Sequence, residues 1–125
     1  MNGKALVFHP AGGMTETPLD RVPNLTFLQK AVGGFIEAVP SFDTIARDGA
    51  VVDCIAFCNE EGKLHRLEVN RNATRLWDEA LRRIKTDRGA PAYPTGLTGR
   101  DGKPVDLLVG NICVIVGDAE LLEAL

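Results

Sequence analysis

The sequence predicts one α+β domain, residues 1–125, in which a mostly antiparallel sheet of about four to six strands carries two main helices on one face. The first observation is length, because 125 residues with 45% apolar side chains leave room for one hydrophobic core. The second is that short apolar runs alternate with two segments of helical periodicity. Their order is close to β-α-β-β-α-β, which packs most simply with both helices on the same face of one sheet.

The first strand and the first helix are both bounded by breaking residues. Residues 5–8 form an apolar run of strand composition, and a proline and two glycines follow it. In residues 24–32 the apolar side chains recur at helical spacing. This helix has two candidate N-caps, Asn24 and a capping box that starts at Thr26, and Gly33 suits the left-handed conformation that closes a helix.

Two further strands are expected before the middle of the chain. Residues 35–39 alternate apolar with small or polar side chains, as in a strand with one buried face. We expect residues 41–50 to form a loop with an Asp-Gly turn, and residues 51–58 to form a third strand that ends at the turn 59–62. Residues 63–69 are a weaker candidate for its hairpin partner, because their apolar residues do not alternate.

The clearest element is an amphipathic helix over residues 73–84, with Asn72 as a fitting N-cap. Its apolar side chains recur at the spacing of one helical face, and charged side chains occupy the opposite face. Two acid-before-base pairs, each worth about 0.3 kcal/mol on a solvated face, are expected there: Asp78 with Arg82, and Glu79 with Arg83.

The C-terminal part of the chain combines an irregular loop with strands. Residues 89–104 contain four glycines and three prolines, which predicts an irregular surface loop. Residues 105–109 and 112–116 are either one long kinked strand or a tight hairpin. Residues 118–125 are compatible with a closing helical turn.

Charge and cysteine content restrict the setting of the protein. The net charge of −3, from 14 basic and 17 acidic residues, argues against a nucleic-acid partner. No segment approaches the run of about 20 apolar residues that a membrane helix needs, and the first thirteen residues lack a secretory signal. The three cysteines are an odd number and lie in apolar runs, which argues against a disulfide framework. We therefore expect a cytoplasmic location and no membrane partner.

Few side chains are available for catalysis or for holding a cofactor. His9 and His65 lack metal-ligand spacing to any cysteine. The cysteines have no basic partner that would hold a thiolate, and the single serine, Ser41, is not in a nucleophile elbow. The sequence therefore predicts no catalytic residue, no metal and no cofactor, and a protein that is not an enzyme.

Four blocks follow one another along the chain: residues 28–39 (LQKAVGGFIEAV), 58–64 (CNEEGKL), 70–74 (NRNAT) and 109–111 (VGN). Together they resemble a family of small uncharacterised proteins that is described only as a domain of unknown function and is encoded largely by bacteriophages, prophages and related mobile elements. The resemblance extends from about residue 5 to residue 116 and departs from the family pattern around residues 43–51 and 89–104. It implies a mobile-element setting and no particular activity.

The polar residues of these blocks are the candidate site for a ligand or partner: Glu37, Asn59, Glu60, Glu61, Lys63, Asn70 and Asn111. The four residues between 59 and 63 belong to one turn, which could hold a cation or polar ligand, and the alternative is a solvated turn. The other three would join this site if they converge above the sheet. The alternative is that Asn70 caps a helix and Asn111 supports a turn next to Gly110.

These observations favour recognition over covalent chemistry. We expect a non-enzymatic phage or mobile-element accessory protein that binds a host or phage protein, for example as an antagonist of host defence. The alternative is a protein that binds or sequesters a small, nucleotide-like ligand. Residues 63–88 carry eight basic and four acidic side chains, and residues 101–125 carry one and five, so opposite patches could orient a partner or favour a homo-oligomer. The alternative is that these charges form an ordinary solvated surface.

Overall fold

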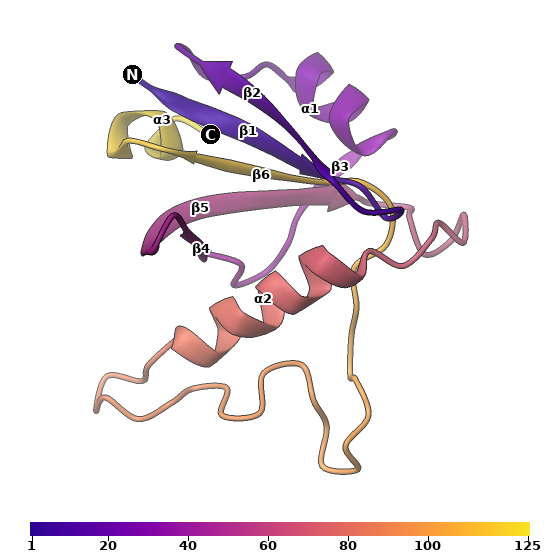
Figure 1. Ribbon diagram of the computed structural model, residues 1–125, viewed down its shortest axis with the longest axis vertical. Coiled ribbons are helices and arrows are strands. Elements are labelled where there is room, and N and C mark those ends of the chain that lie inside the picture. Colours follow the sequence, from indigo (N-terminus) through magenta and orange to yellow (C-terminus); the bar gives the residue numbers. More distant parts are fainter.

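A six-stranded antiparallel sheet forms the centre of the computed structural model, which describes residues 1–125 (Figure 1). The strand order is β2-β1-β6-β5-β3, and β4 pairs with the first half of β5. This architecture confirms the predicted α+β class. The elements are β1 (Gly3–Phe8), β2 (Met14–Leu19), α1 (Leu25–Val32), β3 (Ile36–Ala38), β4 (Thr44–Arg47), β5 (Ala50–Asn59), α2 (Arg71–Arg83), β6 (Ile112–Gly117) and α3 (Ala119–Glu123).

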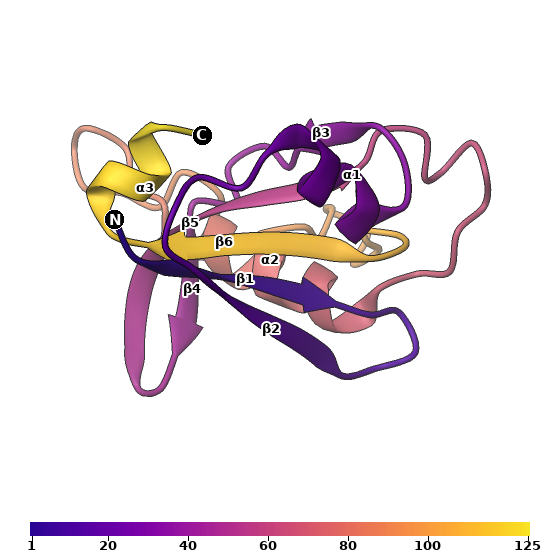
Figure 2. The same cartoon turned by 90° about the horizontal axis from the view of Figure 1, so that it is seen from above.

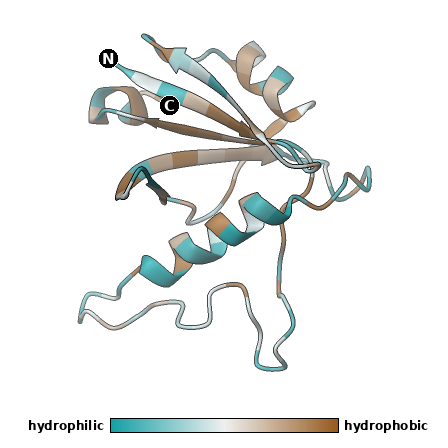
Figure 3. Cartoon of the chain, viewed as in Figure 1, coloured by the Kyte–Doolittle hydropathy of each residue, from teal (hydrophilic) through white to brown (hydrophobic).

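The helices cover both faces of the sheet, so the expectation of both main helices on one face is wrong. Helix α2 lies on one side, and α1 and α3 lie on the other (Figure 1). Strand β6 shows the reason, because its residues 112–116 are all buried and form the most hydrophobic strand in Figure 3. A central strand that is apolar on both faces needs a cover on each of them.

Two hydrophobic cores result, one on each face of the sheet. The larger core joins Leu6, Ile112 and Val114 to Trp77 and Leu81 of α2. The smaller core contains the alternate residues of the same strands, which pack against α1 and α3: Ala5, Cys113, Ile115, Leu28, Val32 and Leu121. Successive residues of β1 and β6 therefore stabilise opposite layers.

Two strands lie where the sequence predicts none, so the expected β-α-β-β-α-β order is incomplete. Strand β2 is polar and contains Pro18, and its pairing with β1 alone reveals it as a strand. Strand β4 falls in the expected loop 41–50, where Asp48 and Gly49 both have positive φ, as a two-residue hairpin turn requires. The turn signal is correct, and the β4–β5 hairpin that it closes projects beyond the sheet (Figure 2).

Two expected strands are absent. Residues 63–69 form turns rather than a hairpin partner, and residues 105–109 are irregular apart from one bridge between Val69 and Val109. The choice between a kinked strand and a hairpin at residues 105–116 is therefore wrong in both forms, and only β6 is a strand. Gly110 turns the chain with a φ of 71° just before it.

The helix caps agree with the sequence at α1 and differ at α2. Asn24 caps α1 by accepting a hydrogen bond from Phe27 N at 2.8 Å, and Gly33 closes it in the left-handed conformation. Helix α2 is capped by Asn70 rather than Asn72, because the Asn70 side chain accepts from Ala73 N at 3.1 Å. None of the three helices is long and apolar enough to cross a membrane.

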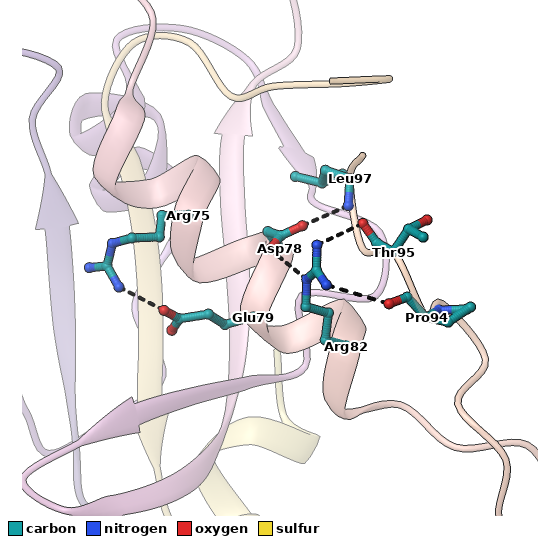
Figure 4. Close-up of polar contacts among 7 residues, drawn as sticks. All are labelled: Arg75, Asp78, Glu79, Arg82, Pro94, Thr95 and Leu97. Atoms are coloured by element: carbon teal, nitrogen blue, oxygen red, sulfur yellow. Dashed lines mark hydrogen bonds and ion pairs between the residues drawn. The ribbon is translucent and has the colours of Figure 1, made fainter. Parts of the chain in front are cut away.

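Residues 84–105, the strap, run along the outer side of α2 without helix or strand and contain the expected loop 89–104. Figure 4 shows how α2 holds the strap: Asp78 accepts from Leu97 N at 2.7 Å, and Arg82 donates to Thr95 O at 2.9 Å. Leu97 itself is buried in the larger core. Gly96 is required at this contact, because a Cβ there would lie 2.1 Å from the Asp78 Oδ1 atom.

Of the two expected ion pairs on α2, one forms. Asp78 binds Arg82 at 2.9 Å, but Glu79 binds Arg75 at 2.8 Å instead of Arg83. Arg83 points toward the sheet, where its Nε donates to Thr44 Oγ1 at 3.0 Å. Contact with β4 removes Arg83 from the solvated face on which the expected pair depends.

Candidate functional site

A cleft of about 200 Å3 lies at the β3 edge of the sheet, between the sheet and residues 106–109, which precede β6. Its charged residues are Glu37, Glu60, Lys63 and Asp106. Its remaining walls are mostly apolar: Ala38, Val39, Pro40, Trp77, Leu107, Leu108 and Val109, together with Cys58 and Asn59. The cleft therefore combines apolar walls with a small number of charged groups, which is the usual composition of a binding site.

Strand pairing places Glu37 at this cleft. Glu37 lies directly opposite Cys58 in the antiparallel pair of β3 and β5. Directly opposite residues of an antiparallel pair share a face of the sheet, and Cys58 packs against the larger core on the α2 side. Glu37 therefore points to the α2 side, at the outermost strand, where its carboxylate reaches solvent.

An ion pair spans the cleft. Lys63, from the turn after β5, donates a hydrogen bond to Asp106 Oδ1 from the irregular segment before β6. The same carboxylate oxygen accepts from Leu107 N at 2.7 Å, which fixes its direction. Both side chains are substantially exposed, at 62% and 41%, so the pair adds little stability and can exchange partners.

Trp77 forms the inner wall of the cleft. It is 5% exposed, and its indole Nε1 donates to the carbonyl of Pro40 at 2.9 Å. Trp77 belongs to the apolar face of the helix predicted over residues 73–84; it packs in the larger core as that face does, and it also lines the cleft. Since it is the only tryptophan of the chain, its fluorescence reports on this site.

The cleft cysteine is a protonated thiol rather than a nucleophile. Burial raises the pKa of Cys58, and the negative charge of Glu37 raises it further, against the opposing effect of Lys63. Burial also raises the pKa of Cys54 and of Cys113 to about 12. Catalytic cysteines need a lowered pKa, so none of these thiols is prepared for thiolate chemistry.

The candidate residues from the sequence separate into two groups. Four of them, Glu37, Asn59, Glu60 and Lys63, line the cleft. Asn59 does so with its amide already engaged, because Oδ1 accepts from Glu61 N at 2.9 Å and Nδ2 donates to Val32 O at 3.4 Å. Glu60 and Glu37, by contrast, form no ion pair within the chain.

Three candidate residues lie outside the cleft. Asn70 is fully buried and donates to the carbonyls of Phe8 and Gly110 at 3.0 and 2.9 Å while capping α2. Its amide is thus fully used inside the protein, which corrects its assignment as a binding residue. Asn111 donates to Ala31 O at 3.3 Å and joins α1 to the start of β6.

Glu61 is the third candidate residue outside the cleft. It binds His65 at 2.9 Å and lines a separate depression beside Phe35.

The glycine pair of the first sequence block explains why Asn59 is held in place. Gly33 closes α1, and a Cβ on the next residue, Gly34, would lie 2.8 Å from Asn59 Nδ2. The glycine-glycine and Asn-Glu-Glu-Gly blocks are therefore two sides of one contact. This contact gives both blocks a structural role that does not depend on a ligand.

The sequence does not identify Trp77 or Asp106 as residues of this cleft. Trp77 follows the apolar periodicity of α2, and Asp106 precedes an apolar run that looks like a strand. Their position depends on the irregular path of residues 106–109, which brings Asp106 to within hydrogen-bonding distance of Lys63. No local pattern encodes that path, since its hydrogen bonds go to residues distant in the sequence: Val109 bridges to Val69, Asn70 N donates to Leu108 O at 2.8 Å, and Leu108 N donates to Thr74 Oγ1 at 2.9 Å.

A second cleft, of about 330 Å3, lies on the other side of Asp106, between α2 and the strap. Arg71, Thr74 and Arg75 from α2 line one wall, and Thr98 lies on the strap side. Arg75 is bound to Glu79, whereas Arg71 forms no ion pair within the chain. This cleft is the more basic of the two.

The profile of one protein family, described as Domain of unknown function (DUF3846), matches residues 3–122. The match begins with β1 and ends within α3, so it includes every strand of the sheet and both clefts. No curated protein and no solved structure matches the chain. The expected membership of a domain-of-unknown-function family is therefore confirmed: the chain belongs to the DUF3846 family.

Proposed function

We propose that this protein acts by binding another protein, and that the cleft beside β3 receives a basic side chain of the partner. The observation that carries the proposal is the pair of carboxylates, Glu37 and Glu60, which line this cleft without an ion-pair partner in the chain. With Asp106 they place three carboxylates against one ammonium group, that of Lys63. An arginine or lysine side chain would complement this excess of negative charge.

The size and walls of the cleft support a single side chain rather than a larger molecule. Pockets that enclose drug-sized ligands have volumes of roughly 300–1,000 Å3, and this cleft has about 200 Å3. The stems of arginine and lysine pack on apolar surface while their charged ends stay near water. Val39, Trp77 and Leu107 offer such a surface behind the carboxylates.

The resemblance to phage and prophage proteins supports a partner in the bacterial host. Small proteins of mobile elements are expected to act on proteins that they do not encode, which makes a host protein, such as a component of a defence system, the expected partner. A phage protein is the other possibility that this setting implies. In either case the protein acts by occupying a surface of its partner and has no reaction to catalyse.

The alternative function, small-ligand binding, has its support in the second cleft. That cleft has about 330 Å3, and Arg71 and Arg75 in its wall could pair with the phosphate of a nucleotide-like ligand. The cleft beside β3 would repel the same phosphate. A ligand at about 100 times its Kd adds about 2.7 kcal/mol of stability, so a nucleotide that raises the Tm of the wild-type protein but not of Arg71→Ala would favour this alternative.

Affinity capture with a matched pair of variants tests the proposed function. Glu37→Lys reverses the charge at the cleft, and Glu123→Lys makes the same change at an exposed residue of α3. We expect bacterial partner proteins captured by the wild-type protein to be retained by Glu123→Lys and lost by Glu37→Lys. Equal recovery by both variants would show that the cleft does not bind the partner.

A further inference from the structure

The strands at the two ends of the order β2-β1-β6-β5-β3 differ in the edge that they present to solvent. Proline cannot donate a backbone hydrogen bond, and Pro18 is the last but one residue of β2. Strand β2 also carries Glu16, whose carboxylate forms ion pairs with Lys4 at 2.8 Å and with Arg47 at 3.5 Å. These are features of an edge that does not accept another strand.

Strand β3, which is three residues long, contains no proline, and its one charged side chain, Glu37, forms no ion pair. Val39 N donates to Ala56 O at 2.8 Å. Because the pattern alternates along an antiparallel strand, the backbone N–H and C=O groups of Val39 and Glu37 point toward β5. The N–H and C=O groups of Ile36 and Ala38 therefore point away from β5, on the side where the sheet ends. They are free to pair with one added strand.

The side chains of β3 specify what such a strand must carry. Glu37 points to the α2 side and lines the cleft, whereas Ile36 points to the α1 side, where it packs against the smaller core. Neighbouring side chains on one face of a sheet interact across the strands. An added strand would therefore need basic residues on the Glu37 face and apolar residues on the Ile36 face, alternating along its length.

We propose that the partner contributes an extended segment of alternating basic and apolar residues, which pairs with the free edge of β3 and extends the sheet. This inference rests on the proposed function, because the basic side chain beside Glu37 is the one that the cleft receives. Main-chain hydrogen bonds would supply affinity, and the alternating side chains would supply specificity.

A second copy of this chain fits the edge less well than such a partner. Pairing of two β3 strands would bring Glu37 close to Glu37 of the second copy, and like charges on neighbouring strands destabilise the pair. Each copy would also bring its own Glu60 to the same edge. Charge complementarity therefore favours a basic segment from a different protein.

The test uses a fluorescein-labelled peptide in which arginine alternates with valine, and measures its binding by fluorescence anisotropy. Two further peptides carry N-methyl groups on the backbone nitrogens of either the arginines or the valines. In a paired strand only one of these sets faces β3. We expect one methylated peptide to bind about tenfold or more weakly, since it loses its hydrogen bonds to the edge, and the other to bind like the parent.

Protein variants separate this inference from the proposed function. Glu37→Lys should weaken the parent peptide about tenfold or more, and Glu123→Lys should bind it like the wild-type protein. Ala38→Pro removes an outward N–H without affecting the ladder to β5, and should weaken binding to a similar extent. If this variant does not fold, the two methylated peptides alone test whether the peptide pairs with β3.

Three results would overturn part of the account. If the peptide depends on Glu37 but both methylated peptides and Ala38→Pro bind like their parents, strand addition is wrong and recognition by the cleft stands. If one methylated peptide is weakened but Glu37→Lys is not, the cleft is not the site of the basic side chain. If the wild-type protein does not bind the parent peptide, both proposals fail.

Discussion

The asparagine amides and the cleft carboxylates of the four sequence blocks have opposite structural roles. The side-chain amides of Asn59, Asn70 and Asn111 each donate to a backbone carbonyl of a distant segment. Glu60, which directly follows Asn59, and Glu37 from the first block form no ion pair within the chain. Polar residues that are adjacent in the sequence, such as Asn59 and Glu60, can therefore differ in role, and their hydrogen-bond partners distinguish stability from recognition.

The largest expected effect concerns Asn70, the asparagine that is fully buried. Asn70→Ala removes the α2 cap and leaves the carbonyls of Phe8 and Gly110 unpaired in the interior, so it should lower the free energy of unfolding by about 3 kcal/mol. Urea denaturation measures this value. The control is Asn72→Ala, at the exposed neighbouring asparagine, which should change it by less than about 0.5 kcal/mol. Similar losses in the two variants would contradict the assignment of the cap.

Asp78 differs from the cleft carboxylates because it has a hydrogen-bond partner in the strap. Asp78 accepts from Leu97 N, so Asp78→Ala should lower the free energy of unfolding by about 1–2 kcal/mol and increase hydrogen exchange along residues 94–98. Glu79→Ala removes a carboxylate that contacts only the exposed Arg75, and should cost less than about 0.5 kcal/mol. Unchanged exchange in Asp78→Ala would show that this contact does not hold the strap.

The cleft carboxylates should contribute almost nothing to folding. Glu37→Gln and Glu60→Gln, alone or combined, should change the free energy of unfolding by less than about 0.5 kcal/mol, because neither side chain has an ion-pair partner to lose. Thermal and urea denaturation provide the measurement. A loss comparable to that of Asn70→Ala would abolish the distinction between the two groups.

The smallest effect concerns acid stability at the end of the sheet where the termini meet. Hydrogen bonds from Leu121 N and Asn2 N lower the pKa of Asp118 below its ordinary value of 3.8. A carboxylate with a lowered pKa in the folded state stabilises the fold above its unfolded pKa, and this contribution disappears as the pH falls through the folded pKa. Asp118→Asn keeps a capping side chain but no charge, so its urea midpoint should fall slightly at neutral pH and depend less on pH below about 4.

Much of the fold could be predicted from the sequence, because the core elements have strong periodicity. The helix over residues 73–84, the strand over 51–58 and the caps of α1 follow directly from apolar spacing and turn residues. The polar strands β2 and β4 could not be predicted, since their only strand property is a partner distant in the sequence. The two-sided cover was predictable in principle from the unbroken apolar run of β6.

The charged residues of the candidate site could be predicted from the sequence, but their arrangement in space could not. Glu37, Glu60 and Lys63 lie on a predicted strand and turn, and strand pairing alone brings them together. Asp106 and Trp77 join them through an irregular segment, whose path no local pattern determines. The inward direction of Asn70 was equally hidden, because an N-cap and a ligand-binding asparagine look the same in sequence.

The most direct test of recognition by the cleft is the fluorescence of Trp77, which lines the cleft and is the only tryptophan. Titration with the unlabelled arginine-valine peptide should change the emission in a saturable manner. The change should be absent with a glutamate-valine peptide and strongly reduced in the Glu37→Gln/Glu60→Gln double variant. An emission that stays constant, or that changes equally in the double variant, would contradict the claim that this cleft receives a basic side chain.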